Sequence, residues 1–193
     1  MNRFEIVKDN IVNRRSIKPG DMNGGIIEKE QILQLLELAN YAPTHGRTEP
    51  WRFVVYEKEA KKTFCADHAN LYKTHTDPEK FTTAKYDKLV SQGDTLSHIV
   101  VAYMKRSVGN SIPAIEEAAA VSAAIQNILL GAAALDIAVL WSTGGMTHHP
   151  SLKTYLGLGE EDLVMGLLLM GYTDQPALPV KRNSTIDSKV MWM

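Results

Sequence analysis

Hydrophobic residues recur at helical spacing in three parts of the chain. Over residues 3–13, apolar side chains return at every third or fourth position, which predicts an amphipathic helix. The same spacing predicts a second helix from about residue 27, and Ala42 followed by Pro43 marks its end. Residues 115–135 form the longest helical pattern. They are apolar on nearly every side, so we expect this helix to be the central buried element.

Short runs of β-branched, aromatic and aliphatic residues predict four strands. The predicted strands cover residues 51–56, 99–104, 138–141 and 163–170. The last of them is a continuous apolar run, which is typical of a strand buried on both faces. Residues 59–95 are polar, and the only regular structure that they predict, weakly, is helix. A short helix is expected near 150–156. Helices and strands are mixed, with few strand–helix–strand units. The sequence therefore predicts an α+β fold in a single domain, residues 1–193.

Composition and charge exclude several classes of protein. Of the 193 residues, 45% are hydrophobic and 22% are charged, which is typical of a soluble globular protein and not of a disordered or collagen-like one. The formal net charge of −1 gives no basic excess for binding nucleic acid or an acidic membrane. The single cysteine, Cys65, indicates a reducing compartment, and the charged N-terminus has no apolar signal core. We therefore expect a cytoplasmic protein that binds neither nucleic acid nor membrane.

The sequence lacks the motifs of several common catalytic and metal centres. No GxGxxG follows a predicted strand and no Walker-type loop is present, which argues against a dinucleotide fold or a P-loop. The six histidines form no HExxH motif, so we expect no metal site. Cys65 has no recognisable catalytic partner, and Ser142 does not lie in a GxSxG elbow. The sequence thus predicts no catalytic side chain of these kinds.

The first polar cluster follows the first predicted helix. It consists of Arg14, Arg15 and Ser16, with Lys18 two residues later. Guanidinium groups bind phosphate oxygens in a forked geometry and a serine hydroxyl adds a hydrogen bond, so these residues could bind an anion. The alternative is that the cations only complement the C-terminal end of the helix dipole. Taken alone, the cluster favours this simpler role.

Two more polar segments lie at the ends of predicted strands. A loop dense in hydrogen-bond donors and acceptors, residues 42–51, leads into the first strand and suits the polar edge of a planar ring, although it could equally be a surface connection. The segment after the third strand, residues 141–145, is rich in small residues that let a ligand approach the backbone. Two cations, Lys181 and Arg182, lie in the tail.

The order of these segments carries more information than any one of them. An RRS segment comes first, and an AP-T block that ends in PWRFVV follows it. An alanine-rich helix, a WSTG segment and a late KR pair then follow in turn. Across residues 3–192, this order closely resembles the nitroreductase family of FMN-dependent oxidoreductases. The resemblance implies a central mixed or antiparallel sheet flanked by helices. It also implies an interlocked homodimer with one FMN per site at the subunit interface, where helix 115–135 would form the buried dimer core.

Carried over position by position, the resemblance implies which residues bind FMN. Those matching contacts to the phosphate and ribityl chain are Arg14, Arg15, Ser16 and Arg182, together with Lys181. Those matching contacts around the flavin ring are Lys18 at the pyrimidine edge, Thr44, His45 and Glu49 in a loop from the partner subunit, and Ser142, Thr143 and Gly144 at a strand end. Two positions depart from the family pattern, since Arg47 and Glu49 replace the commoner Asn and Gln. An ionised Glu49 only accepts hydrogen bonds and would repel negative charge on the reduced ring.

The resemblance also implies a reaction. NAD(P)H would pass hydride to flavin N5 and leave, after which a nitroaromatic, a quinone or a similar electron-poor acceptor would take its place in a ping-pong cycle. The flavin carries this chemistry, so no acid–base side chain is required. Three alternatives stay open: a flavoenzyme of the same fold that dehydrogenates or dehalogenates one metabolite, a flavin-binding dimer without turnover, and a helical interaction module without cofactor.

Overall fold

Four strands form one antiparallel sheet at the centre of the computed structural model, which describes residues 1–107, 109, 111–176, 179 and 182–193. The strands are β1 (Trp51–Glu57), β2 (His98–Met104), β3 (Ala138–Ser142) and β4 (Leu163–Gly171). Their order across the sheet is β1-β2-β4-β3, and each neighbouring pair is antiparallel. The α+β class is therefore confirmed, and β1 and β3 are the two edges of the sheet.

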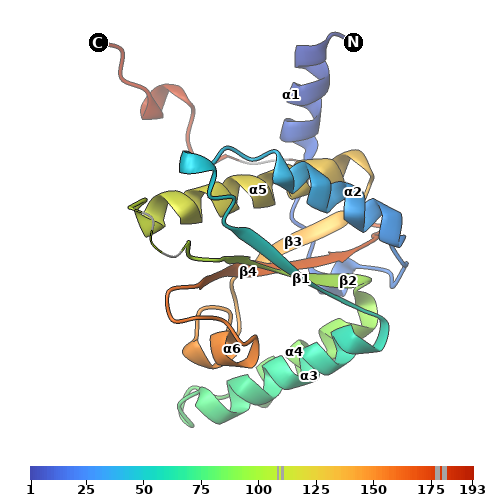
Figure 1. The fold of residues 1–193 in the computed structure, drawn as a ribbon. Coiled ribbons are helices and arrows are strands. Elements are labelled where there is room, and N and C mark those ends of the chain that lie inside the picture. Colours follow the sequence, from blue (N-terminus) through green and yellow to red (C-terminus); the bar gives the residue numbers. More distant parts are fainter. Residues whose placement is uncertain (108, 110, 177–178, 180–181) are drawn as a thin grey trace.

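Helices cover both faces of the sheet (Figure 1). On one face lie α2 (Lys29–Asn40) and α5 (Ala114–Ala134). On the other lie α3 (Lys58–His75), α4 (Thr83–Thr95) and α6 (Pro150–Tyr155). The predicted helices and strands match these bounds within a few residues, except in the polar region 59–95, which forms two full helices.

The sheet lies between two hydrophobic cores, and this explains its continuous apolar strands. Successive side chains of a strand point to opposite faces. In β4, Leu168 and Met170 enter the core under α2 and α5, whereas Leu167 and Leu169 enter the core under α3 and α4. All four are buried. The predicted burial of this strand on both faces is confirmed.

Helices α3 and α4 are polar helices with narrow buried faces. In α3, the buried face includes Phe64, His68 and Tyr72, which are spaced four residues apart and therefore lie on the same side of the helix. The N-terminus of α4 is capped by Thr82, whose side chain accepts a hydrogen bond from the backbone N–H of Lys85. The narrow apolar stripe explains why the average composition of 59–95 predicts helix so weakly.

Within one chain, α5 is buried on one face only, contrary to the expectation of burial on nearly every side. Val121 and Ile125 are fully buried against the sheet, whereas Ala119 and Gln126 on the outer face are exposed. The helix is long and apolar enough to span a membrane by length and composition, but packing of its inner face on the sheet is typical of a core helix in a soluble protein. The cytoplasmic location stays a prediction.

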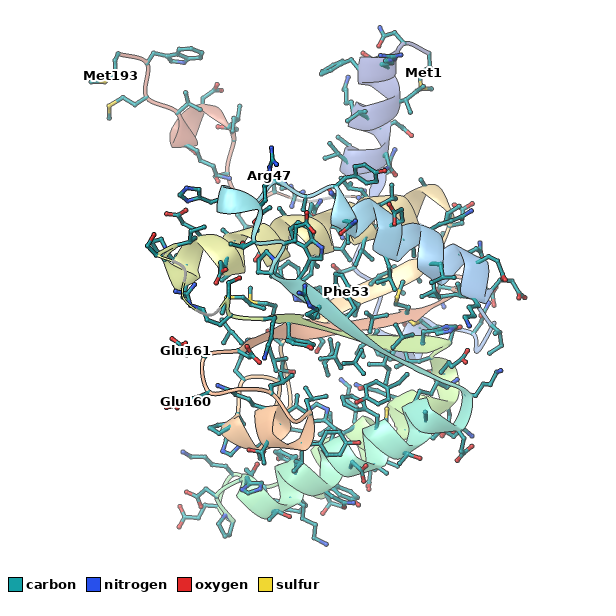
Figure 2. The ribbon with its side chains drawn as sticks, viewed as in Figure 1. Met1, Arg47, Phe53, Glu160, Glu161 and Met193 are labelled. Atoms are coloured by element: carbon teal, nitrogen blue, oxygen red, sulfur yellow. The ribbon has the colours of Figure 1, made fainter. Side chains whose placement is uncertain are left out.

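Two terminal segments extend away from the body of the chain. Figure 2 places Met1 and Met193 at the far ends of α1 (Arg3–Asn13) and of the C-terminal tail. No residue of α1 is buried, and Phe4 is 70% exposed. Trp192 in the tail is 92% exposed. Both segments therefore expose large apolar side chains that this single chain leaves uncovered.

Candidate functional site

A cavity of about 510 Å³ lies between the sheet and helix α4, beside the short helix Pro19–Asp21. Its floor is apolar and is formed by Leu140, Leu167 and Leu169 of strands β3 and β4. Its polar lining includes Lys18, His68, Lys85, Lys88, Gln92 and Ser142. The size and the combination of an apolar floor with a few polar groups are typical of a small-molecule site.

The chain after α1 reaches this cavity by pairing with the sheet edge. Ser16 forms a parallel bridge with Val139 of β3, and the backbone N–H of Ile17 donates to the Val139 carbonyl at 3.2 Å. Because this pairing is parallel, the chain continues along β3 toward its C-terminal end. Lys18 then lies in the cavity with Ser142 and Gly144. Lys18 is far from Ser142 and Gly144 in the sequence, yet all three line one cavity, and all three were predicted to lie near the cofactor.

The two arginines before Ser16 have different surroundings. Arg15 donates through Nη1 to the carbonyl oxygens of Val12, at 2.6 Å, and of Arg14, at 2.9 Å. This is the helix-terminus role that the sequence offered as the alternative to anion binding. Arg14 is half-buried and, with Asn13 and Asp136, lines a smaller cavity of about 150 Å³ near the other end of β3.

The turn after β3 brings backbone groups into the cavity. The Ser142 hydroxyl accepts a hydrogen bond from the Gly144 N–H at 3.3 Å, and the Thr147 hydroxyl donates to the Gly144 carbonyl at 2.6 Å. Thr143 and Gly144 are exposed. Gly145 has φ +65°, and a Cβ there would lie 2.7 Å from the ring of His68. Glycine is therefore required at 145 both by the backbone conformation and by the close approach of a side chain.

His68 was not predicted as a site residue, yet it joins helix α3 to this turn. Its Nε2 accepts a hydrogen bond from the backbone N–H of Met146 at 2.8 Å. The side chain is buried, packs against Phe64 and lines the cavity. Burial, with a smaller contribution from the positive charge of Lys85, lowers the pKa of His68 to about 4. The imidazole is therefore neutral at physiological pH.

The cavity has an excess of positive charge. Lys85 and Lys88 are three residues apart on α4, so they lie on the same side of that helix. Lys85 lies over the ring of Tyr72, with 4.5 Å between Nζ and the ring centroid. Lys18 adds a third cation, whereas Asp21 is the one carboxylate among the described residues that line the cavity. Anionic ligands are favoured there.

The loop of Thr44, His45 and Glu49 lies elsewhere in the chain. It precedes β1, at the opposite sheet edge from β3, and contacts the start of α5 (Figure 1). The Thr44 hydroxyl is 3.0 Å from that of Thr48, and His45 Nδ1 is 2.7 Å from Glu116 Oε2. Within one chain, the structure does not bring this loop to the cavity.

The backbone of this loop adopts an unusual conformation. Gly46, Arg47 and Glu49 all have positive φ, at 59°, 54° and 42°. L-residues other than Asn and Asp rarely adopt this region. The Arg47 side chain extends from the loop on the α5 side of the molecule (Figure 2). The two positions that depart from the family pattern are therefore also strained, and such strain is concentrated at functional sites.

The tail cations are only partly described. Lys181 lies outside the described residues. Arg182 is exposed, at the start of the extended tail. The expected convergence of Arg182 with Arg14 on one phosphate thus stays a prediction.

Among the polar cavity residues that sequence reasoning missed, four lie on long helices: His68, Lys85, Lys88 and Gln92. All four come from α3 and α4, the helices that the polar composition of 59–95 barely predicted. A period-3.6 search would have found the His68 face, with Phe64 and Tyr72 one turn away on either side. No local signal shows that this face is turned to the end of β3.

Comparisons with known proteins agree with this geometry. The nitroreductase family model matches residues 11–172. YfhC of Bacillus subtilis, named as a proposed NAD(P)H nitroreductase, is 25% identical over 186 residues, covering 96% of this chain and 93% of its own. A nitroreductase-like family protein from Bacillus cereus superposes with a TM-score of 0.85 at 26% identity, covering 100% of this chain and 98% of that one.

A more distant structure shares the fold alone. The FMN-dependent nitroreductase NfnB from Mycobacterium smegmatis, solved in complex with NADPH, has a TM-score of 0.76 at 14% identity, and each chain is covered completely. The family model matches more than four fifths of the sequence, including the segment that enters the cavity and all four strands. The chain belongs to the nitroreductase family.

Proposed function

We propose that this protein is an FMN-dependent oxidoreductase that takes hydride from NAD(P)H and reduces small electron-poor acceptors such as nitroaromatics and quinones. The observation that carries the proposal is the cavity beside β3, where Lys18, Ser142 and Gly144 meet over an apolar floor. Family membership and the naming of YfhC as a proposed NAD(P)H nitroreductase support the same function.

The residues present fit the chemistry of FMN. Leu140, Leu167 and Leu169 provide an apolar surface for a planar ring. Lys18 and the Gln92 amide suit the polar edge of that ring, since an amide both donates and accepts. Arg14 and Ser16 lie where the chain approaches the cavity along β3, and they would hold the phosphate together with Arg182.

When bound, FMN supplies the hydride chemistry, and the protein supplies position and electrostatics. Lys18 stabilises negative charge at the ring edge, and one well-placed donor of this kind contributes about 3 kcal/mol. Gly144 has no side chain of its own, so its backbone lets a ring lie close. No side chain has to carry a proton in the hydride step, because FMN carries that chemistry itself.

We further propose a homodimer in which the loop around Thr44, His45 and Glu49 completes the site of the partner chain. Loop and cavity lie at opposite edges of the same sheet. The apolar side chains of α1 and the tail, among them Phe4 and Trp192, would be covered by a second copy. The exposed outer face of α5 would be covered in the same way.

The test is an anaerobic titration of the protein with FMN and then with NADH or NADPH. We expect tight FMN binding, bleaching of the flavin by a nicotinamide, and recovery of the colour when a nitroaromatic or quinone is added. Arg14→Ala should weaken FMN binding at least tenfold, because hydrogen bonds to charged groups are worth about 1.5–3 kcal/mol. Arg3→Ala, on the exposed start of α1, is the matched control. Protein that binds no FMN would refute the proposal.

A further inference from the structure

His68 is a buried polar side chain whose two ring nitrogens face different surroundings. Nε2 accepts the hydrogen bond from the Met146 N–H, at 2.8 Å. A ring nitrogen that accepts a hydrogen bond carries no proton. In the neutral ring, the proton must then lie on Nδ1, which makes Nδ1 a hydrogen-bond donor.

No group in the described part of the chain uses that donor. Among the residues that the structure describes, no atom accepts a hydrogen bond from Nδ1 of His68. Among the same residues, every fully buried side-chain nitrogen or oxygen atom has a hydrogen-bond partner. Because the His68 side chain is 96% buried overall and lines the cavity, Nδ1 must reach free space on the cavity side.

The neighbours of the ring keep it neutral and oriented. Phe64 packs against one side, with 5.8 Å between ring centroids, and Gly145 allows close approach on another. Lys85 is the charged group that acts on the ring most directly. Together with Lys18 and Lys88, which also line the cavity, it opposes a positive charge on His68, whereas Asp21 favours one. Burial adds to the opposition, so His68 donates without becoming an imidazolium.

We propose that His68 is a positioning residue of the cavity, which holds the Gly144–Met146 turn through Nε2 and donates from Nδ1 to a carbonyl or nitro oxygen of the bound ligand. The inference rests on the proposed function. The oxygen belongs either to the flavin ring or to the electron acceptor, and the two sources share the chemistry of a neutral oxygen that accepts one hydrogen bond.

Three variants test the proposal in the full-length protein. His68→Leu removes both hydrogen bonds, whereas His68→Gln keeps one acceptor and one donor. His75→Leu is the matched control, since it removes an exposed histidine from the same helix. Each variant is measured for FMN affinity by flavin fluorescence, and for kcat and KM with p-nitrobenzoate and menadione.

We expect His68→Leu to worsen one of two quantities, FMN affinity or KM for the acceptor, by about tenfold (about 1.4 kcal/mol). The loss falls on FMN affinity if the flavin accepts the bond, and on KM for the acceptor if the acceptor does. For His68→Gln, the same quantity should lie within about threefold of the wild-type value, and His75→Leu should match the wild type. If His68→Leu retains wild-type values of both quantities, the proposal is overturned while the proposed function stands. Wild-type protein that binds no FMN overturns the proposed function itself, and the inference with it.

A second measurement does not depend on the variants folding. Long-range ¹H–¹⁵N spectra of the wild-type histidines report which ring nitrogen carries the proton. We expect the Nδ1–H form for His68 at pH 7, and a shift of that proton when FMN or p-nitrobenzoate is added. An Nε2–H form, or an Nδ1 proton that neither ligand perturbs, would contradict the proposal.

Discussion

The neutral, buried state of His68 should make the protein sensitive to acid. In the unfolded chain, a histidine binds a proton with a pKa near 6.5, whereas the folded environment lowers the pKa of His68 to about 4. Between these values the unfolded state binds more protons than the folded one, so the free energy of unfolding falls as the pH falls. The stability is fully present above about pH 6.5 and is lost progressively down to about pH 4.

The size of this loss follows from the pKa difference. About 2.5 pKa units at about 1.4 kcal/mol each correspond to about 3 kcal/mol. Urea unfolding at pH 7 and pH 4, at one fixed protein concentration, measures the loss for the wild type and for His68→Gln. Because glutamine does not titrate, the variant should lose about 3 kcal/mol less.

Other groups contribute to acid unfolding, but they cancel in this comparison. Burial raises the pKa of Asp162, but hydrogen bonds from Lys105 and from the backbone N–H groups of Arg106 and Gly159 outweigh it, so the net effect lowers that pKa. This carboxylate also loses stabilisation in acid, and by the same amount in both proteins. If the wild type and His68→Gln lose the same stability between pH 7 and pH 4, the argument for a neutral buried ring is wrong.

Three further predictions follow from the cavity and the strained loop. Gly145→Ala should lower the free energy of unfolding by about 3 kcal/mol, measured in urea, because its Cβ would meet the His68 ring and its φ is positive. Arg47→Gly should raise the free energy of unfolding by about 1 kcal/mol, and with it the thermal midpoint, because glycine adopts φ 54° without strain. An unchanged midpoint would contradict this. Lys85→Glu combined with Lys88→Glu should raise KM for NADPH about tenfold at low ionic strength, and roughly 0.5 M salt should reduce the difference.

The sequence predicted most elements because their patterns are local. The apolar run 163–170 is unmistakable as a strand covered on both faces, and the structure confirms it in β4. Helix α2 was equally clear, since its apolar face repeats with a helical period. In α3, by contrast, the six buried positions form a narrow stripe among twelve others in a lysine-rich helix, so averaged polarity conceals the buried face.

The site was predictable only where its residues are contiguous with a recognisable motif. Lys18 follows the RRS segment, and Ser142 closes β3, so both were found from the sequence and both line the cavity. His68 and Gln92 lie in no motif, and they reach the cavity because α3 and α4 pack against each other and against the sheet. That packing depends on long-range contacts, which one sequence does not reveal.

The predicted FMN residues fall into two groups, and their separation constrains how a complete site can form. Lys18 and Ser142 lie at the β3 edge, whereas Thr44 and Glu49 precede β1 at the other edge. Three strand spacings of about 4.8 Å separate these edges by about 14 Å. The loop also contacts α5 on one face of the sheet, whereas the cavity lies beside α4 on the other face. If both groups bind one FMN, we propose that the second group comes from another copy of the chain.

A shared site of this kind predicts complementation between inactive variants. Arg14→Ala damages the β3 group and Glu49→Lys damages the loop group, so each homodimer alone should bind FMN weakly at both sites. In a mixed dimer, one site receives both damaged groups and the other receives neither. Random mixing makes half of the dimers mixed, so about a quarter of the sites should recover. Differently tagged chains, coexpressed and purified through both tags, isolate the mixed dimer, in which half of the sites should recover. Mixed dimers without FMN binding would show that the loop acts on its own chain, whereas normal FMN binding by the Glu49→Lys homodimer would show that the loop has no part in the site.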